Sequence, residues 1–450
     1  MKLPEAFENR MKALLGDEYP AFAATYEQDA VKALHLNEKA ITEEAFRSQA
    51  GFAVTPLAHV GGGFTFALDK PGNHPLHHAG AFYLQDPSAM ATVAAAEDFL
   101  RTPGLRCLDV CASPGGKSAQ IASLLGEGSF LVSNEIMPAR CKTLAGNMER
   151  MGFADLLVTN ADTKRLAAWF PAFFDFVLAD VPCSGEGMFR KYPESVSEWN
   201  EKTPAYCAER QREILKNVMG TLAPGGRLLY STCTFAEEEN EGNVAWLLET
   251  YPDLRLLPVS EALQAVSAPA KGFPEARRMY PHLCPGEGQF FALFEKAGTP
   301  AVGAERDPAF ADGRKYLSRA EIEAVTAFLD GAVEKNGDLN LCKLGDRIAS
   351  VPFAVPDHNV FAAGITLGTV EKNRLVPHHQ LFKALGRRFL RKIELAPDDP
   401  RLLSYLRGAE IDADSENGWA VVTTLGIPVG GAKVVDGRAK NHYPKGLRIL

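Results

Sequence analysis

The sequence predicts an α/β fold centred on a parallel, doubly wound sheet, with a small N-terminal α+β domain before it and a β module after it. Three observations support this prediction. From Leu105 onward, short apolar segments alternate with helix-like segments. A glycine-rich turn follows the first apolar segment, and the first four of them run into acidic residues. Because open α/β sheets bind ligands at the carboxyl ends of their strands, a site is expected there.

The composition indicates a folded protein of several domains. The chain has 450 residues, of which 46% are hydrophobic and 23% are charged. No segment resembles a signal peptide or a membrane span, so we expect a cytoplasmic protein. The eight cysteines are scattered and form no C-x-x-C pair, which argues against a disulfide framework and a zinc site. We expect no bound metal.

The charge is unevenly distributed along the chain. The net charge is −8 overall, whereas residues 381–450 contain twelve Lys or Arg and eight Asp or Glu. A basic module on an acidic body is compatible with RNA contact through that module. Residues 438–445 also interleave basic and aromatic side chains, which suits phosphates and stacked bases, although a solvated surface loop is equally compatible with this pattern.

Residues 1–80 are expected to form the N-terminal domain. Residues 3–28 have apolar side chains at helical spacing, and residues 64–68 indicate a short strand between loops rich in glycine and proline. Three histidines follow, at His74, His77 and His78. Their spacing is loose and no acid or cysteine completes a site, which favours a packed or hydrogen-bonded loop over a metal site.

Residues 81–297 are expected to form the central α/β core. Its strands are predicted at 105–111, 130–134, 156–159, 174–179 and 227–231, with later strands at 254–259 and 290–294. Its helices are predicted at 88–100, 119–125, 138–151, 204–222 and 237–250. Pro138 at the start and Gly152 after the end of the third helix are typical boundary residues.

The last third of the chain is expected to contain two further regions. In the intermediate region, residues 298–380, an amphipathic helix is predicted at 318–333, followed by short strand-like segments to about residue 367. Residues 381–450 predict a compact β module, with strands at 419–425, 432–435 and 447–449 separated by turn residues.

The turn from Ser113 to Ser118 follows the first core strand and opens a helix. Its two glycines let backbone N–H groups approach a ligand, and the helix N-terminus favours negative charge. A Walker A loop would need glycine where this chain has Cys111, and the dinucleotide pattern G-x-G-x-x-G is absent. The remaining interpretations are an ordinary strand-to-helix turn or the turn of a Rossmann-like methyltransferase, which holds the methionine part and ribose of S-adenosylmethionine.

Acidic residues come at the ends of the first four core strands: Asp109, Glu135, Asp162 and Asp180. Glu135 lies 19 residues beyond Gly116, near the spacing at which an acid accepts both ribose hydroxyls. Asp162 is placed to accept a hydrogen bond from the adenine amino group. Any one of these acids is more often a cap or a turn residue, but their occurrence at four successive strand ends favours cofactor binding.

Two cysteines, Cys183 and Cys233, follow predicted strand ends on the ligand edge of the sheet. Thr234-x-x-Glu237 has the pattern of a capping box, which predicts a helix N-terminus beside Cys233, where the dipole favours a thiolate. A thiolate near a methyl donor suggests addition to C6 of cytosine, which activates C5 for methylation. Asp180 could hydrogen-bond the pyrimidine and stabilise the adduct. The alternative for each cysteine is a small buried hydrophobic residue.

Three segments, CASPGGKS, DVPCSGEGMFRK and YSTCTFAEEENEGNV, resemble the Nop/Sun-type family of RNA cytosine-5 methyltransferases. The resemblance implies a Rossmann-like class I methyltransferase core that binds S-adenosylmethionine. It implies that Cys233 attacks the base and that Cys183 assists product release. The cofactor-binding residues it implies are Cys111, Ala112, Ser113, Pro114, Gly115, Gly116, Lys117, Glu135, Asp162 and Asp180.

Segments outside the core extend the resemblance to nearly the full chain. HPLHHAGAFYLQDPSAM, RMYPHLCPGEGQFFALFEK and NGWAVVTTLGIPVGGAKVVDGRAKNHYPKGLR resemble the small-subunit ribosomal RNA methyltransferase F branch. This branch implies a PUA-like RNA-binding module at residues 381–450 and a cytosine of small-subunit (16S) ribosomal RNA as substrate. We expect a monomer that acts on this RNA, either free or in the assembled 30S subunit. The alternatives are a transfer RNA cytosine-5 methyltransferase and a non-catalytic ribosome-assembly factor.

Overall fold

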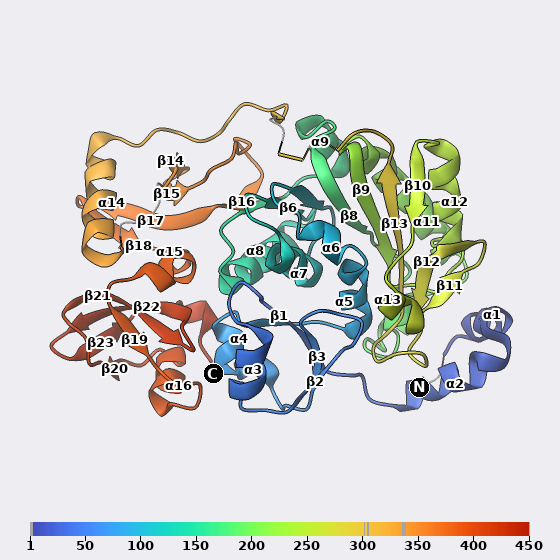
Figure 1. The fold of residues 1–450 in the computed structure, drawn as a ribbon, viewed down its shortest axis with the longest axis horizontal. Coiled ribbons are helices and arrows are strands. Elements are labelled where there is room, and N and C mark those ends of the chain that lie inside the picture. The colour runs from blue at the N-terminus through green and yellow to red at the C-terminus, as the bar shows by residue number, and fades with distance from the viewer. Residues whose placement is uncertain (1–2, 301, 304–305, 335–338, 450) are drawn as a thin grey trace.

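A ten-stranded sheet forms the centre of the computed structural model, which describes residues 3–300, 302–303, 306–334 and 339–449 (Figure 1). Its main path runs β11-β12-β13-β9-β8-β5-β6-β7-β16, and β10 pairs with β13. The strands are β5 (Arg106–Asp109), β6 (Phe130–Asn134), β7 (Leu156–Thr159), β8 (Phe174–Asp180), β9 (Leu222–Thr232), β10 (Leu254–Leu257), β11 (Ala268–Ala270), β12 (Phe273–Met279), β13 (Gln289–Lys296) and β16 (Val360–Ala363). The five from β5 to β9 are parallel, as predicted, so their carboxyl ends share one edge.

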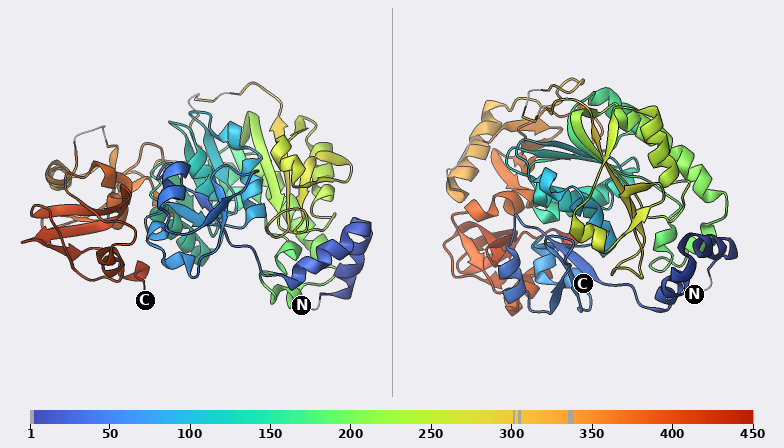
Figure 2. Two further views of the ribbon diagram at one scale, coloured as in Figure 1. Left: turned by 60° about the horizontal axis from the view of Figure 1, so that its bottom comes forward. Right: turned by 45° about the vertical axis from the view of Figure 1, so that its right-hand side comes forward.

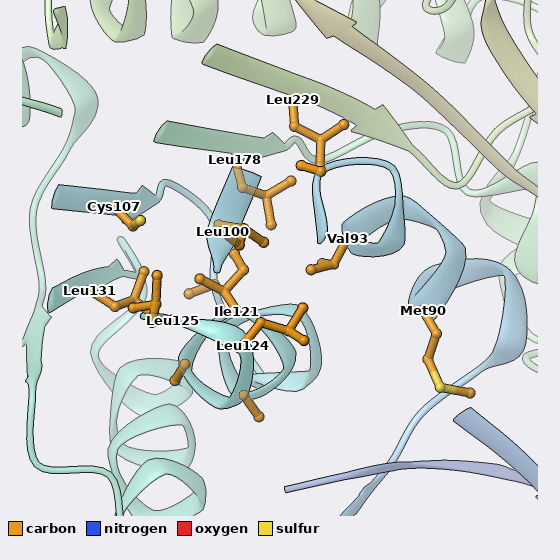
Figure 3. Close-up of a cluster of buried hydrophobic side chains, with 14 of the residues drawn as sticks. Met90, Val93, Leu100, Cys107, Ile121, Leu124, Leu125, Leu131, Leu178 and Leu229 are labelled. Carbon is orange, nitrogen blue, oxygen red and sulfur yellow. The ribbon is translucent and has the colours of Figure 1, made fainter. Parts of the chain in front are cut away.

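Helices cover both faces of this sheet. They are α5 (Pro87–Ala94), α6 (Glu97–Leu100), α7 (Gly116–Leu124), α8 (Pro138–Met151), α9 (Thr163–Trp169), α10 (Ser195–Glu198), α11 (Thr203–Met219), α12 (Glu241–Thr250) and α13 (Glu261–Ala265). Successive strand residues point to opposite faces, so Cys107 packs in one buried cluster and Leu108 in the other. In the first cluster, Ile121 of α7 packs with side chains from α5, α6 and four strands (Figure 3). Burial on both faces explains why the strands are nearly continuous apolar segments.

The N-terminal part divides into a sheet and a separate pair of helices. The sheet has the order β2-β3-β1-β4, built from β1 (Ala33–Leu36), β2 (Val54–Pro56), β3 (Gly63–Phe66) and β4 (Phe82–Leu84), with α3 (Glu43–Gln49) and α4 (Pro75–His78). The helices α1 (Glu5–Leu15) and α2 (Tyr19–Ala24) lie at the far end of the core from the C-terminal module (Figure 2). There Phe7 and Phe22 pack against Phe235 from the core. The four-part division of the chain stays a prediction, and β4 shows that the first sheet continues past residue 80.

The three histidines take part in packing and hydrogen bonds. His74 accepts a hydrogen bond from Leu76 N at 3.2 Å, and Nδ1 of His78 lies 2.8 Å from the Tyr443 hydroxyl. Burial lowers the pKa of His77 to about 2. In the part of the chain that the structure describes, no three His, Cys, Asp or Glu residues gather in an arrangement able to hold a metal.

The intermediate region contributes to two sheets. Its own sheet has the order β14-β15-β17-β18, formed by β14 (Leu341–Leu344), β15 (Arg347–Ser350), β17 (Ile365–Glu371) and β18 (Arg374–Pro377), and α14 (Arg319–Ala332) precedes it. The predicted helix is therefore confirmed, and Ser318 forms a capping box with Glu321 at its start. The strand β16 instead pairs antiparallel with β7 and extends the core sheet.

The C-terminal module is a five-stranded sheet in the order β19-β21-β22-β23-β20. Its elements are α15 (His379–Leu385), β19 (Lys392–Glu394), α16 (Pro400–Leu406), β20 (Ile411–Asp412), β21 (Gly418–Thr424), β22 (Ile427–Val435) and β23 (Arg438–Asn441). The strand predicted at 447–449 is wrong, because residues 445–447 form a 3-10 helix. The strands β19, β20 and β23 were not predicted, and β23 pairs with β22 across a two-residue turn whose Asp436 and Gly437 both have positive φ.

The basic and aromatic segment 438–445 is divided by this arrangement. Arg438 forms an ion pair with Asp412, and Tyr443 is buried beneath its hydrogen bond to His78. Tyr443 therefore has no face for a stacked base. Within the described ranges, none of the helices combines the length and the apolar character that crossing a membrane requires.

Candidate active site

The two predicted cysteines lie side by side at the carboxyl edge of the sheet. Cys183 follows the end of β8 and Cys233 follows the end of β9, and the parallel pairing of Asp180 with Ser231 aligns these strand ends. The two Sγ atoms are 3.1 Å apart, and the backbone N–H of Cys233 donates to Sγ of Cys183 at 3.3 Å. Both side chains are partly exposed, whereas Cys107 is fully buried. The two thiols therefore form an accessible pair.

The capping box predicted at Thr234 and Glu237 is wrong. Helix α12 begins only at Glu241, and residues 233–240 form loop and turn structure. The Thr234 hydroxyl lies 2.7 Å from the Ser184 hydroxyl and accepts from Ala236 N at 3.2 Å, so it does not cap a helix. Helix α12 therefore does not begin next to Cys233, and its dipole does not favour the thiolate there.

A cation beside the thiols takes the place of the missing helix dipole. Lys117 Nζ donates to Asp180 Oδ2 at 2.8 Å, and Oδ1 of the same carboxylate accepts from the Ser231 hydroxyl at 2.6 Å. Burial opposes the charge of Lys117, but Asp180 and Cys233 outweigh it and raise the lysine pKa. Lys117, predicted as a cofactor residue, thus faces the Asp180 carboxylate and the Cys233 thiol.

The predicted glycine turn has the local structure that a ligand needs. Gly115 has φ of +116° and precedes α7, whose first turn has no side-chain cap. This φ strains any residue with a side chain, and a Cβ on Gly115 would also lie 2.9 Å from the end of Met148, so glycine is favoured here. The uncapped N–H groups at the start of α7 are available to a carboxylate.

Hydrogen bonds fix the residues before Gly115. The Ala112 N–H donates to the last carbonyl of β6 at 2.8 Å, and the Ser113 hydroxyl donates to the backbone oxygen of Arg140 at 3.1 Å. The Pro114 carbonyl accepts from the Tyr83 hydroxyl at 3.1 Å. Tyr83 belongs to β4, so the N-terminal sheet supports the turn.

The predicted ribose and adenine acids occupy different environments. Glu135 is buried directly after β6, where its Oε1 accepts from Met137 N at 2.9 Å. Asp162 is exposed and caps α9, accepting from Arg165 N at 2.8 Å. If Asp162 contacts a ligand, its carboxylate does so in addition to capping α9.

An exposed apolar pair completes this part of the edge. Ile136 and Met137 are 55% and 54% exposed, although both are large hydrophobic residues, and they directly follow Glu135. The uncapped α7 N-terminus, the acid and this apolar surface match the carboxylate, ribose and adenine of S-adenosylmethionine. The residues present therefore fit the cofactor. The apolar pair was not predicted, although its position after a strand-end acid is visible in the sequence.

Two buried glutamates near the thiols were also missed. Glu186 accepts from Trp199 Nε1 at 3.0 Å and from Phe235 N at 3.2 Å. Glu239 accepts from Gln211 Nε2 at 2.6 Å. Both lie within the sequence segments that carry the resemblance, but only the folded structure shows that they face the cysteine loops.

Comparison with known proteins decides the family. Residues 101–295 match the family described as 16S rRNA methyltransferase RsmB/F, residues 3–87 its RsmF N-terminal domain, and residues 392–449 the methyltransferase RsmF PUA domain. Ribosomal RNA small subunit methyltransferase F of Cronobacter sakazakii is 32% identical, over 99% of this chain and 96% of that protein. The chain belongs to this RsmF family. The resemblance found in the sequence is confirmed, and the protein is an S-adenosylmethionine-dependent methyltransferase.

Solved structures share the fold of the core. A methyltransferase homologue from Pyrococcus horikoshii is 24% identical, with a TM-score of 0.57 over 65% of this chain and 95% of its own. NSun6 from the same organism, solved with the S-adenosylmethionine analogue SFG, is 19% identical, with a TM-score of 0.58 over 66% and 99% of the two chains. The Rossmann-like core of this RsmF relative is thereby confirmed.

Proposed function

We propose that the enzyme methylates C5 of cytosine in small-subunit ribosomal RNA, with Cys233 as the nucleophile and Cys183 as the thiol that assists product release. The observation that carries this proposal is the pair of partly exposed thiols, 3.1 Å apart, beside the Lys117–Asp180 ion pair. The substrate class comes from the relatives, which are named as ribosomal RNA small subunit methyltransferases. The enzyme is proposed to act as a monomer in the cytoplasm.

The chemistry follows from the groups at this edge. The Cys233 thiolate forms a bond to C6 of the cytosine, which breaks the C5–C6 double bond and makes C5 nucleophilic. Asp180 accepts a hydrogen bond from the exocyclic amine, and Lys117 offsets the negative charge that develops on the ring. Bound S-adenosylmethionine supplies an electrophilic methyl group for C5. A base then takes the C5 proton, and the bond between Cys233 and C6 breaks with the assistance of Cys183.

The cofactor is proposed to lie along the edge from the glycine turn to α9. The turn from Cys111 to Lys117, with the uncapped N–H groups at the start of α7, would hold its methionine part. Glu135 would accept from the ribose hydroxyls, and Asp162 from the adenine amino group. The support is the uncapped helix, the buried acid and the exposed Ile136 beside it.

RNA contact is proposed to continue in a groove of the C-terminal half, formed by α14, the β17–β18 hairpin and the sheet from β21 to β22. It is lined by Lys372, Arg374, Arg391, Lys433, Trp419 and His442. Lys433 lies over the Trp419 ring at 5.7 Å. The lining contains four cationic side chains and one acidic side chain, with aromatic side chains among them. This composition suits the phosphates and unstacked bases of RNA.

A labelling experiment tests the substrate. The protein is incubated with S-adenosylmethionine labelled in the methyl group and with free small-subunit ribosomal RNA, the assembled subunit or bulk transfer RNA. We expect label in 5-methylcytidine from ribosomal RNA. Comparison of the free RNA with the assembled subunit shows which of the two is the substrate. Label only in transfer RNA would replace the substrate, and label in another nucleoside would overturn the thiol mechanism.

A further inference from the structure

Glu239 is a fully buried carboxyl group in the turn before α12. Its Oε2 accepts hydrogen bonds from Ser184 N at 3.1 Å and from Gln211 Nε2 at 2.6 Å, and its Oε1 accepts from the Ser184 hydroxyl. All these partners are donors, which is the environment of an ionised carboxylate. Among the described residues, no Lys or Arg forms an ion pair with it.

The partners of Glu239 hold the chain on both sides of Cys183. Ser184, which directly follows the cysteine, donates to the carboxylate through its N–H and its hydroxyl. Gln211, from α11, donates to the carboxylate and also to the Pro182 carbonyl at 3.0 Å. One buried acid therefore determines where this thiol lies.

The same group reaches the Cys233 loop through a single hydroxyl. The Ser184 hydroxyl lies 2.7 Å from the hydroxyl of Thr234, which directly follows Cys233. The Cys233 carbonyl also accepts from Gly187 N at 2.9 Å. The two loops are thus fixed to each other, and Glu239 lies on the Cys183 side of the pair.

The charges around the two thiols differ. Lys117 interacts with Cys233, and its own charge is balanced by the ion pair with Asp180, whereas the buried Glu239 interacts with Cys183. Glu186 is also buried nearby, but Arg10 from α1 forms an ion pair with it and balances its charge. Glu239 therefore provides the unbalanced negative charge that opposes a thiolate at Cys183.

We propose that Glu239 is a positioning residue for the thiol pair: it fixes both cysteine loops and holds the proton on Cys183, so that Cys233 carries the thiolate. The inference rests on the proposed function, because it explains which of two adjacent thiols attacks the base. Sγ atoms 3.1 Å apart share one proton readily, and a nearby charge decides which sulfur holds it.

The pKa directions agree with this geometry. The hydrogen bond with Cys233, burial and the nearby charges, including that of Glu239, raise the pKa of Cys183. Burial raises the pKa of Glu239 to about 7, against hydrogen bonds from Ser184 and Gln211. The other ionisable groups that face this region are Glu186, Tyr230, Cys207, Arg210, Arg212, Asp180 and Lys117. Above pH 7 the carboxylate is ionised, and its charge then favours the proton on Cys183.

The test measures the ionisation of Cys183 without RNA. In a Cys233→Ser background, the rate of iodoacetamide alkylation at Cys183 is followed from pH 6 to pH 10 by peptide mass spectrometry. Glu239→Gln keeps the shape but removes the charge and one of the two acceptor oxygens, and we expect the midpoint to fall by about one pH unit, or about tenfold faster alkylation near neutral pH. Glu238→Gln is the matched control, because Glu238 is the exposed neighbour, and its midpoint should not move.

A second variant separates charge from loop geometry. Ser184→Ala removes the hydroxyl link between the loops but keeps the carboxylate, so its midpoint should stay close to that of the parent. An unchanged midpoint in Glu239→Gln, or equal shifts in Glu239→Gln and Ser184→Ala, would overturn the proposal. If Glu239→Gln does not fold, Glu239→Asp takes its place. This variant retains the charge, so the midpoint of Cys183 alkylation should stay at the parent value. A fall of one pH unit in Glu239→Asp would also overturn the proposal.

Turnover gives an independent readout. With Cys233 restored, Glu239→Gln should lower kcat for methyl transfer about tenfold and leave the KM for RNA unchanged, because the charge acts on the thiols and not on RNA binding. A change confined to KM would contradict the positioning role. Since alkylation needs neither RNA nor methyl transfer, an enzyme that fails to methylate cytosine would refute the proposed function while still testing Glu239.

Discussion

The catalytic edge and the C-terminal groove are built in different ways. At the edge, hydrogen bonds of 2.6–2.8 Å join Asp180 and Ser231, near the ends of neighbouring strands, to each other and to Lys117 of α7. In the groove, Lys372 and Arg374 are exposed on a hairpin and face Lys433 on another sheet. Hydrogen bonds at the edge hold a few atoms in one geometry, whereas the groove has positively charged side chains spread over an exposed surface.

This difference predicts two kinds of mutational response. A group that must sit within bonding distance of one atom has no substitute, so its loss removes a chemical step. Exposed cations attract phosphates together, so the loss of one lowers RNA affinity only partly. Salt screens its contribution further. The edge should therefore respond in an all-or-none way, and the groove in a graded way.

Cys233→Ala should have the largest effect. It removes the proposed nucleophile, so methyl transfer should fall by at least about 10³-fold, while binding of S-adenosylmethionine stays intact. The measurement is single-turnover transfer of labelled methyl to RNA, with cofactor affinity determined by calorimetry on the same sample. Retained turnover would move the nucleophile to another residue.

Cys183→Ala should separate attack from release. Cys233 can still add to the base, but release is slowed, so a covalent RNA–protein adduct should accumulate. The adduct is seen as a band that resists denaturing electrophoresis and disappears after nuclease treatment. Cys107→Ser, at a fully buried thiol within β5, should give no adduct. Normal turnover of Cys183→Ala without adduct would mean that the two roles are misassigned.

The comparison also explains what could be predicted from the sequence. The strands at 130–134 and 156–159 match the structure, because strands buried on both faces are short apolar runs with polar ends. The site acids were found by the same rule, since each follows such a run. The local sequence pattern is therefore enough to locate site residues at this edge, because each of them follows a strand in the same way.

Tertiary contacts account for the features that sequence patterns missed. The capping box at Thr234 failed because its hydroxyl bonds Ser184, 50 residues away, in place of a helix N-terminus. The contacts of Glu239 and the groove depend on segments far apart in the chain. The turn at Asp436 and Gly437 is different, because it was among the predicted turn residues, and only the strand that directly follows it was missed.

The groove should give a graded effect. Arg374→Ala combined with Lys433→Ala removes one cation from each wall, so RNA affinity should fall about tenfold and the salt slope by roughly 1 to 2 units. Lys392→Ala with Arg407→Ala removes the same charge from exposed positions outside the groove and should change neither the affinity nor the slope by as much. Removal of residues 381–450 should flatten the slope further. Equal effects of the two double variants would place the RNA elsewhere.

The last prediction concerns Lys383, which lies between the N-terminal domain and the C-terminal module that carries part of the groove. Its buried Nζ donates to the Ala79 carbonyl at 2.5 Å and to the Pro428 carbonyl, so it joins the N-terminal domain to the C-terminal module. Burial, with Arg150 nearby, lowers its pKa to about 7, while Glu149 partly opposes this. The unfolded chain then binds more protons than the folded chain between about pH 7 and 10.

The free energy of unfolding should therefore rise with pH in this window, by about 1–3 kcal/mol from this one group. Lys383→Met removes that titration, so the wild type should gain stability relative to the variant as the pH rises from 7 to 9.5. Denaturant unfolding of both proteins at matched pH values measures the difference. A constant difference across the window would show that Lys383 keeps its ordinary pKa, and that water reaches the contact between the N-terminal domain and the C-terminal module.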